Sequence, residues 1–141
     1  MNSDSASGAE APVEPARGPR SEAPGEPTIL ATRSLPADAG VLRVQLDLEI
    51  TPELDCFEGH FDGLPLLPGV TQLHWAVMFG RRHFPLPPRF THMSAIKFVR
   101  VITPCCRLVL SLEFEATRGE LRFRYDLGDM PCSSGSVGFG P

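Results

Sequence analysis

The sequence predicts an α+β fold in which one antiparallel β-sheet wraps around one long central helix. Residues 41–50 alternate apolar and polar side chains, which indicates a half-buried strand. Residues 70–84 place apolar side chains on most sides of a helix, which is typical of a helix buried in the middle of a fold. Four further strands follow the helix, and strands joined by short turns pair antiparallel.

The composition limits the classes of partner. The 141-residue chain has a net charge of −4, which does not favour nucleic acid. No apolar run is long enough to span a membrane, and the N-terminus lacks the pattern of a secretory signal. The four cysteines form no CxxC motif, and the adjacent pair Cys105-Cys106 is a poor disulfide framework. We therefore expect a reduced, cytoplasmic protein that binds no metal, membrane or nucleic acid.

The chain divides into a tail and one domain. Residues 1–28 are rich in Pro, Ala and Glu and carry few apolar side chains, so this tail is predicted to be disordered. The domain then covers residues 29–141. Thr28-Ile29-Leu30 favours a short edge strand, and residues 36–40 favour a turn.

The strands after the helix are expected from their alternation and from the turns between them. Their predicted ranges are 93–101, 107–117, 121–126 and 133–139, with turns at 118–120 and 128–131. The helix is predicted to end at Phe84, because prolines follow it. Its last turn carries Arg81, Arg82 and His83, where positive charge suits the helix dipole.

The stretch from Phe57 to Val70 contains the candidate catalytic groups of the sequence. It places His60 on a glycine-flanked loop, and Pro68-Gly69 then opens the helix. The first amides of a helix bind negative charge, and an imidazole titrates near neutral pH. One short segment can therefore supply a base and an oxyanion site for chemistry next to a carbonyl.

These residues resemble a known family, the hotdog-fold 3-hydroxyacyl-thioester dehydratases of the FabA/FabZ type. The residues that carry the resemblance are Gly59-His60-Phe61, Pro65, Pro68-Gly69-Val70 and Ile96-Lys97-Phe98. The run Leu67-Pro68-Gly69-Val70, followed by Gln72-Leu73 and Trp75-Ala76, is most similar to the ApeI-like branch, which is associated with aryl polyene pigments.

The resemblance implies a single hotdog domain that works as a homodimer or a hotdog heterodimer. The reaction would be dehydration of 3-hydroxyacyl thioesters in fatty acid or aryl polyene biosynthesis. The substrate would ride on the phosphopantetheine of an acyl carrier protein, and no other cofactor is expected. His60 falls on the catalytic histidine of the family, and Gly69 falls where the family uses a backbone amide to hold the thioester oxygen. Val70 is its neighbour in the same turn, and its amide is the second oxyanion candidate.

One position departs from the family pattern. Fourteen residues after the histidine, FabA/FabZ enzymes carry Asp or Glu, and here that position is His74. His74 could act as the general acid or hold the water, Glu58 or Asp62 could replace it, or dehydration could be lost. The last case favours a non-catalytic hotdog subunit. A hotdog thioesterase is a further alternative, although residues 69–84 contain no Asp or Glu to serve it.

Two further groups of side chains have alternative interpretations. Some aromatic residues are either core or lining of an acyl tunnel, namely Phe57, Phe61, Trp75 and Phe98. The basic residues Arg81, Arg82, Arg89, Lys97 and Arg100 are either a docking rim for an acidic carrier protein or scattered surface charge.

Overall fold

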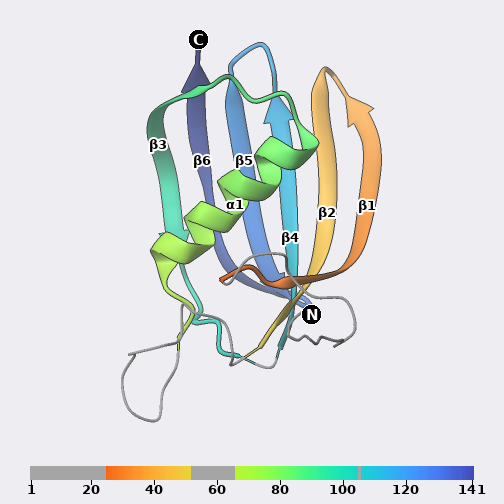
Figure 1. Cartoon of the computed structure of the whole chain (residues 1–141), viewed down its shortest axis with the longest axis vertical. Coiled ribbons are helices and arrows are strands. Elements are labelled where there is room, and N and C mark those ends of the chain that lie inside the picture. Colours follow the sequence, from red (N-terminus) through yellow and green to blue (C-terminus); the bar gives the residue numbers. More distant parts are fainter. Residues whose placement is uncertain (1–24, 52–65, 105) are drawn as a thin grey trace, which may run out of the picture.

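The computed structural model describes residues 25–51, 66–104 and 106–141, and these form six strands and one helix. The elements are β1 (Thr28–Asp38), β2 (Val41–Ile50), α1 (Gly69–His83), β3 (Arg89–Phe98), β4 (Cys106–Glu115), β5 (Glu120–Leu127) and β6 (Met130–Gly140). Figure 1 shows a single sheet with α1 lying diagonally across one of its faces. The α+β fold with an antiparallel sheet is thus confirmed.

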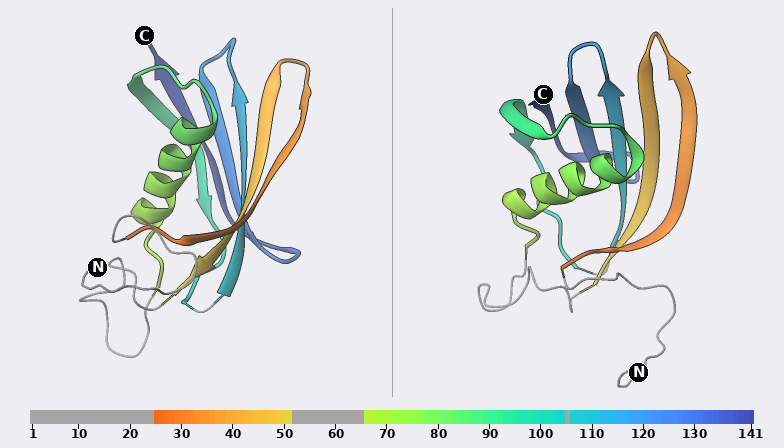
Figure 2. Two further views of the ribbon diagram at one scale, coloured as in Figure 1. Left: turned by 45° about the vertical axis from the view of Figure 1, so that its right-hand side comes forward. Right: turned by 45° about the horizontal axis from the view of Figure 1, so that its top comes forward.

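The strands pair in the order β1-β2-β4-β5-β6-β3, and every neighbouring pair is antiparallel. The two strands at the edges of this sheet are therefore β1 and β3. The sheet twists strongly, and α1 stays on the same side of it in both views of Figure 2.

The core lies between α1 and the face of the sheet that it covers. The alternation predicted for residues 41–50 is confirmed, because β2 has these same bounds and buries every second side chain from Val44 to Ile50. Leu46 of β2 stands opposite Leu110 of β4 in the register, and both side chains are fully buried. Burying large apolar side chains of this kind is the main force that stabilises the sheet against the helix.

Helix α1 agrees with its predicted range to within one residue at each end, but it is shorter than the long central helix expected and is less buried. It has only 15 residues, because the prolines from Pro85 onward cannot continue it, so it is not a long helix. It begins after Pro68, which is the N-cap with φ −63° and ψ 148°. One stripe, which includes Trp75, Ala76 and Phe79, is buried, but Val70 and His74 are exposed. A single sheet covers only one side of a helix, so α1 is not buried on most sides.

Strands β1, β3 and β6 differ most from their predicted ranges. β1 extends to Asp38 and includes Pro36. An edge strand tolerates a proline where the main-chain N–H would point away from the neighbouring strand, because no hydrogen bond is needed there. β3 runs from Arg89 to Phe98 and so lies earlier than predicted. β6 begins at Met130, and the predicted turn before it is confined to residues 128–129.

The residues just before β1 are attached to α1. The indole Nε1 of Trp75 donates a hydrogen bond of 2.7 Å to the carbonyl oxygen of Gly25. Arg82 forms an ion pair of 2.9 Å with Glu26, and Pro27 is buried. In Figure 1 this short segment passes below the helix before the chain enters β1.

Among the residues described, no helix is long and apolar enough to cross a membrane. Cys132 is a free cysteine with a buried side chain. Burial raises the pKa of its thiol, which keeps the sulfur protonated and poorly nucleophilic at neutral pH.

Candidate functional site

Three of the four predicted site residues lie at the start of α1. Gly69 and Val70 are its first two residues, and His74 lies about one turn further along. The fourth, His60, lies outside the described residues, as do Glu58 and Asp62.

The backbone at the start of α1 leaves two hydrogen-bond donors open. The carbonyl oxygen of Pro68 accepts the N–H groups of Thr71 and Gln72, each at 3.1 Å. Within the described part of the chain, the N–H groups of Gly69 and Val70 donate no hydrogen bond. Two such amides at a helix N-terminus are suited to negative charge, and the oxyanion role expected from Pro68-Gly69 stays a prediction.

The side chains beside these amides face outward. Val70 is 73% exposed, and His74 is exposed one turn away on the same side of the helix. The imidazole of His74 has no hydrogen-bond or ion-pair partner among the residues that the structure describes.

Phe98, the last residue of β3, lies against the helix start. Its ring edge approaches Gly69 so closely that a Cβ on Gly69 would lie 2.8 Å from the ring Cζ. The ring is also half exposed. A glycine at position 69 thus allows an aromatic side chain from the edge strand to form one wall beside the open amides, and the sequence alone did not place these two residues together.

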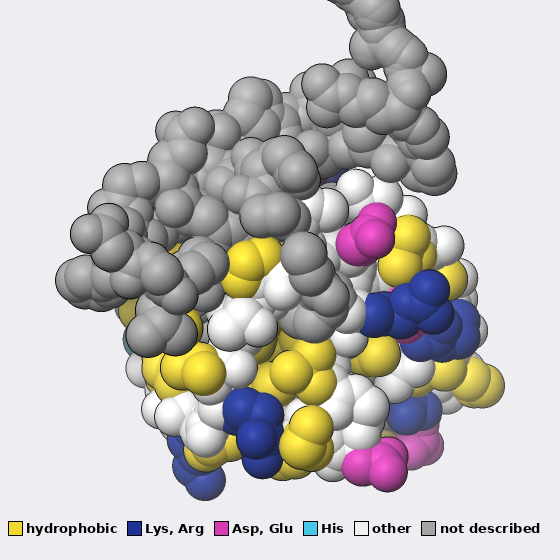
Figure 3. All heavy atoms as spheres, turned by 90° about the horizontal axis from the view of Figure 1, so that it is seen from below, with side chains coloured by type: hydrophobic (Ala, Val, Ile, Leu, Met, Phe, Trp, Pro, Cys, Tyr) yellow, Lys and Arg dark blue, Asp and Glu magenta, His cyan; other side chains and the backbone are white. Residues whose placement is uncertain are grey.

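The surface around Phe98 is apolar. The segment after β3 exposes Val99 by 65% and Val101 by 62%. Figure 3 views the molecule from this end and shows apolar side chains at the surface beside the residues drawn in grey. Exposed apolar patches of this kind mark surfaces that bind another molecule.

Of the other aromatic residues considered for an acyl tunnel, one is in the core and two are not described. Trp75 is only 1% exposed and belongs to the core cluster, so of the two interpretations the structure supports core. Phe57 and Phe61 lie outside the described residues.

The five basic residues do not form one rim. Arg81 and Arg82 lie in the last turn of α1, and Arg89 begins β3 a few residues later. Lys97 lies near the other end of β3, about 30 Å along the strand, and Arg100 follows just after that end. The guanidinium groups of the two helix arginines also form cation–π contacts: that of Arg81 lies over the ring of Phe139, and that of Arg82 lies over the ring of Phe79.

The pKa of His83, in the last turn of α1, differs from that of an ordinary histidine. Partial desolvation lowers the pKa of His83, and the charge of neighbouring Arg82 lowers it further. His83 therefore stays neutral to lower pH than an ordinary histidine.

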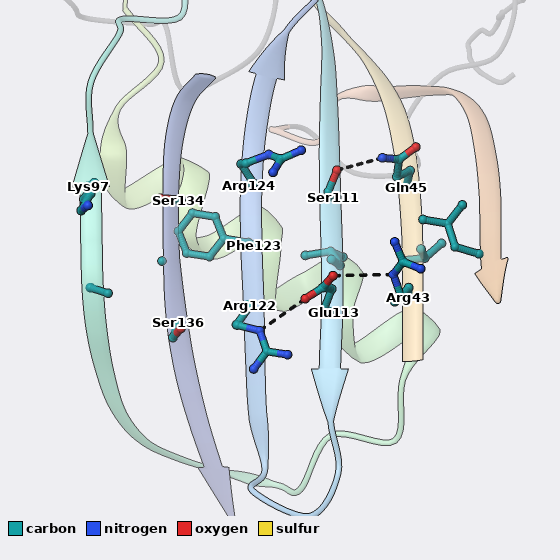
Figure 4. Close-up of a pocket in the computed structure, with 15 residues that line it drawn as sticks. Arg43, Gln45, Lys97, Ser111, Glu113, Arg122, Phe123, Arg124, Ser134 and Ser136 are labelled. Carbon is teal, nitrogen blue, oxygen red and sulfur yellow. Dashed lines mark hydrogen bonds and ion pairs between the residues drawn. The ribbon is translucent and has the colours of Figure 1, made fainter. Parts of the chain in front are cut away.

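The sequence did not predict a hollow of about 430 Å³ on the face of the sheet away from α1. Figure 4 shows it crossing the middle strands, with Arg43, Glu113 and Arg122 joined by ion pairs. The polar positions of the alternating strands are the only signal for it in the sequence. Gly69, Val70 and His74 do not line this hollow, whereas Lys97, one of the basic docking candidates, does. The charges of Arg43, Glu113 and Arg122 satisfy one another there.

No cluster of three or more His, Cys, Asp or Glu suited to a metal ion occurs in residues 25–51, 66–104 and 106–141. The functional groups that these ranges offer at the helix start are therefore backbone amides, an imidazole and an apolar wall.

Comparison with known proteins identifies the family. Residues 37–136 match the model of the ApeI-like family, described as ApeI dehydratase. The chain belongs to the ApeI-like dehydratase family. The match runs from the end of β1 into β6, and so covers the strands between them, the helix and the segment that contains His60.

Relatives of this ApeI-like chain include proteins named as dehydratases. The 3-hydroxyacyl-[acyl-carrier-protein] dehydratase FabZ of Erythrobacter litoralis (strain HTCC2594) is 31% identical, over 70% of this chain and 71% of its own length. The dehydratase heterocomplex ApeI:P from Xenorhabdus doucetiae contains a chain that is 28% identical, with a TM-score of 0.73 over 82% of this chain and 99% of that one.

A crystal structure of an uncharacterized protein from Erwinia carotovora subsp. atroseptica is 33% identical, with a TM-score of 0.76 over 82% of this chain and 97% of that one. These likenesses agree with a hotdog fold for the sheet and helix described above.

Proposed function

We propose that this protein removes water from 3-hydroxyacyl thioesters carried on an acyl carrier protein and forms trans-2-enoyl thioesters, in fatty acid or aryl polyene biosynthesis. The observation that carries the proposal is the pair of amides at Gly69 and Val70, one turn from an exposed His74, in a chain of the ApeI-like dehydratase family. Among the described residues these amides and the His74 imidazole have no hydrogen-bond partner. No cofactor beyond the phosphopantetheine arm is required.

In the proposed mechanism, His60 takes the proton from C2. The electron pair of that C–H bond forms the C2=C3 double bond, and the C3 hydroxyl leaves as water after it is protonated. Negative charge grows on the thioester oxygen meanwhile, and the amides of Gly69 and Val70 stabilise it. Such amides cost no reorganisation during the reaction, because the helix already holds them.

His74 is the proposed general acid. It occupies the family position of an acidic residue, and its imidazole is exposed on the same side of α1 as the open amides. An imidazolium can donate a proton to the leaving hydroxyl, and the resulting neutral imidazole can then be protonated again from solvent.

The proposed working unit is a dimer joined along β3. This edge strand exposes Phe90, Met93 and Phe98, each by about half, and no strand of the described chain pairs with its outer side. Edge strands with apolar side chains favour pairing with another chain. The partner is a second copy or a related hotdog subunit, as the heterocomplex of the relative suggests.

A second candidate is a non-catalytic subunit of such a heterodimer. Two observations favour it: His74 replaces the usual carboxylate, and a relative occurs in a dehydratase heterocomplex. In that case the chain would position or stabilise an active partner.

The test is mass spectrometry of a 3-hydroxyacyl-carrier protein incubated with the purified protein, with one alkyl and one aryl probe. We expect loss of one water, and in the reverse direction hydration of the matching enoyl thioester. His60→Ala and His74→Ala should each lower kcat by about 10²- to 10⁴-fold, the usual contribution of acid–base catalysis.

His83→Ala is the matched control, because it removes another exposed histidine from the same helix, near its far end. It should leave kcat within about twofold of wild type, since surface substitutions away from a site have small effects. If the wild-type protein converts neither probe in either direction, the enzyme proposal fails and the subunit role is favoured. Release of free acid instead would indicate a thioesterase.

A further inference from the structure

The side-chain amide of Gln72 is buried beneath the start of α1. It is 3% exposed, although an unpaired amide in such a place would be costly. Its Nε2 donates to the carbonyl oxygen of Leu67 at 3.1 Å, and its Oε1 accepts the hydroxyl of Ser133 at 2.6 Å. Ser133 is equally buried. We call this arrangement the Gln72 clamp: the Leu67 carbonyl, the Gln72 amide and the Ser133 hydroxyl.

Gln72 holds two consecutive carbonyl groups in front of the helix, one through its side chain and one through its main chain. The side chain of Gln72 binds the carbonyl of Leu67, while its main-chain N–H binds the carbonyl of Pro68 at 3.1 Å. The N–H of Leu67 also donates to the carbonyl of Ile102 at 2.8 Å. Hydrogen bonds therefore hold three consecutive peptide groups, through the N–H of Leu67, the carbonyl of Leu67 and the carbonyl of Pro68.

This arrangement sets the direction of the open amide at Gly69. In a planar trans peptide the N–H points opposite to the preceding C=O. Because the carbonyl of Pro68 points along the helix toward Thr71 and Gln72, the N–H of Gly69 points away from the helix start. Any rotation of the Pro68–Gly69 peptide would turn this donor aside.

Ser133 connects the clamp to the sheet. It lies on β6, in register with Phe98 of β3, whose ring packs against Gly69. The clamp therefore holds the helix start at a fixed place relative to the strand that forms the neighbouring wall.

We propose that Gln72 is a positioning residue, which aims the amide of Gly69 at the thioester oxygen of the substrate. The proposal rests on the proposed dehydratase function. Gln72 does not touch the substrate, and it acts through the peptide groups of Leu67 and Pro68. Because the oxyanion develops only during the reaction, a misaligned donor lowers kcat and leaves KM nearly unchanged.

The main variant is Gln72→Leu, which removes both hydrogen bonds of the clamp at similar side-chain volume. We expect kcat to fall about 10- to 100-fold, as for a misplaced oxyanion donor, with KM within about twofold. Ser133→Ala keeps the bond to Leu67 and removes the anchor on β6, so a smaller fall in kcat is expected. This milder variant also serves if Gln72→Leu does not fold.

Tyr125→Phe is the matched control. The hydroxyl of Tyr125 donates a hydrogen bond of 2.7 Å to the main-chain carbonyl of Gln72. The Tyr125→Phe variant therefore loses one buried hydrogen bond to the same residue and leaves the clamp intact. It should lower the thermal midpoint, as the clamp variants do, with kcat within about threefold of wild type. Equal kcat losses in the clamp variants and in Tyr125→Phe would overturn the proposal, since general loosening would then explain both.

Gln72→Glu adds a pH profile. Its protonated carboxyl can donate to Leu67 and accept from Ser133, whereas the ionised form cannot donate, and burial raises the pKa of such a carboxyl. The kcat of this variant relative to wild type should therefore fall as pH rises. Tyr125 is the titratable side chain bonded to Gln72, and burial raises its pKa well above the usual value, so it stays protonated. A flat ratio with Gln72→Glu would contradict the proposal.

A measurement without substrate separates this proposal from the proposed function. The amide of Thr71 bonds to the Pro68 carbonyl, so its hydrogen exchange reports whether the helix start is held. We expect faster exchange in Gln72→Leu than in Tyr125→Phe. If the wild-type protein is inactive, the dehydratase proposal and the catalytic role of the clamp both fail, while the exchange result still decides whether the clamp holds the amide. Unchanged exchange in Gln72→Leu would overturn the clamp itself.

Discussion

At the scale of single residues, Gly119 lies in the turn between two strands and is hydrogen-bonded to a third. The turn connects β4 to β5, and Gly119 has a φ of +61° there. This value lies in the left-handed region, which glycine adopts without strain. Its carbonyl accepts the N–H of Phe139 on β6 at 2.8 Å, and a Cβ would collide with the carbonyl oxygen of Phe139. The turn is thus packed against the backbone of a strand that is not its neighbour in sequence.

We predict that Gly119→Ala lowers the free energy of unfolding by about 3 kcal/mol, from left-handed strain plus the collision with β6. Urea denaturation monitored by circular dichroism measures this change.

Gly128→Ala separates the two causes. Gly128 also has a positive φ, of 58°, but a Cβ there would meet no atom within 4 Å. This variant should carry only the backbone strain, about 1 kcal/mol. Equal losses in the two variants would show that the contact with Phe139 contributes nothing.

The residue scale also shows what the sequence could and could not establish about the site. Gly69, Val70 and His74 were predicted from the run after Pro68, and the structure places them on one exposed helix start. The contact between Phe98 and Gly69 was beyond the sequence, because it depends on where the edge strand ends relative to the helix. The roles of all four residues, His60, Gly69, Val70 and His74, stay predictions.

At the scale of elements, alternation was informative wherever one face of a strand is buried. Residues 41–50 were predicted with the bounds that β2 has, because its buried and exposed sides alternate without interruption. β1 was predicted too short, since most of its side chains are exposed and carry no apolar signal. β3 was predicted too late along the chain, because Val99 and Val101 continue an apolar pattern on an exposed surface.

Strand β3 contains a strained position. Ala95 has φ +55°, and the pairing of β3 with β6 is irregular between Ser94 and Lys97. This is a β-bulge with an alanine in the left-handed region, which costs about 1–2 kcal/mol relative to glycine.

We predict that Ala95→Gly raises the free energy of unfolding by about 0.5 kcal/mol, because relief of the strain exceeds the added entropy of the unfolded chain. The midpoint of guanidinium denaturation measures it. Ser94→Gly, one residue earlier and without a positive φ, should instead lower stability by about 0.5–1 kcal/mol. A loss of stability in both variants would mean that Ala95 is not strained.

At the scale of the whole molecule, the two edges of the sheet differ in their neighbours. β1 at one edge has Arg33 bound to Asp47 of β2 at 2.7 Å, and its exposed side chains are mixed. β3 at the other edge exposes several large apolar side chains and lies beside the helix start. The proposed dimer therefore uses β3 and would bring a second chain next to His74.

We predict that Met93→Arg, at the middle of β3, converts the proposed dimer to a monomer, because the buried charge would be unpaired at the interface. Sedimentation equilibrium measures the mass. Leu30→Arg is the matched control, since Leu30 is an exposed apolar residue on the opposite edge strand. This control should remain a dimer. A wild-type protein that sediments as a monomer would contradict pairing between copies and favour a related hotdog chain as the partner.

The bond between Trp75 and Gly25 has a spectroscopic consequence. Trp75 is the single tryptophan of the chain, it is 1% exposed, and its indole N–H is held by the backbone just before β1. The intrinsic fluorescence of the protein is therefore the emission of one buried indole, blue-shifted in the native state. Because the same indole senses both the helix core and the attachment of the preceding segment, the protein carries its own optical probe. A red shift without loss of circular dichroism would signal release of that segment alone.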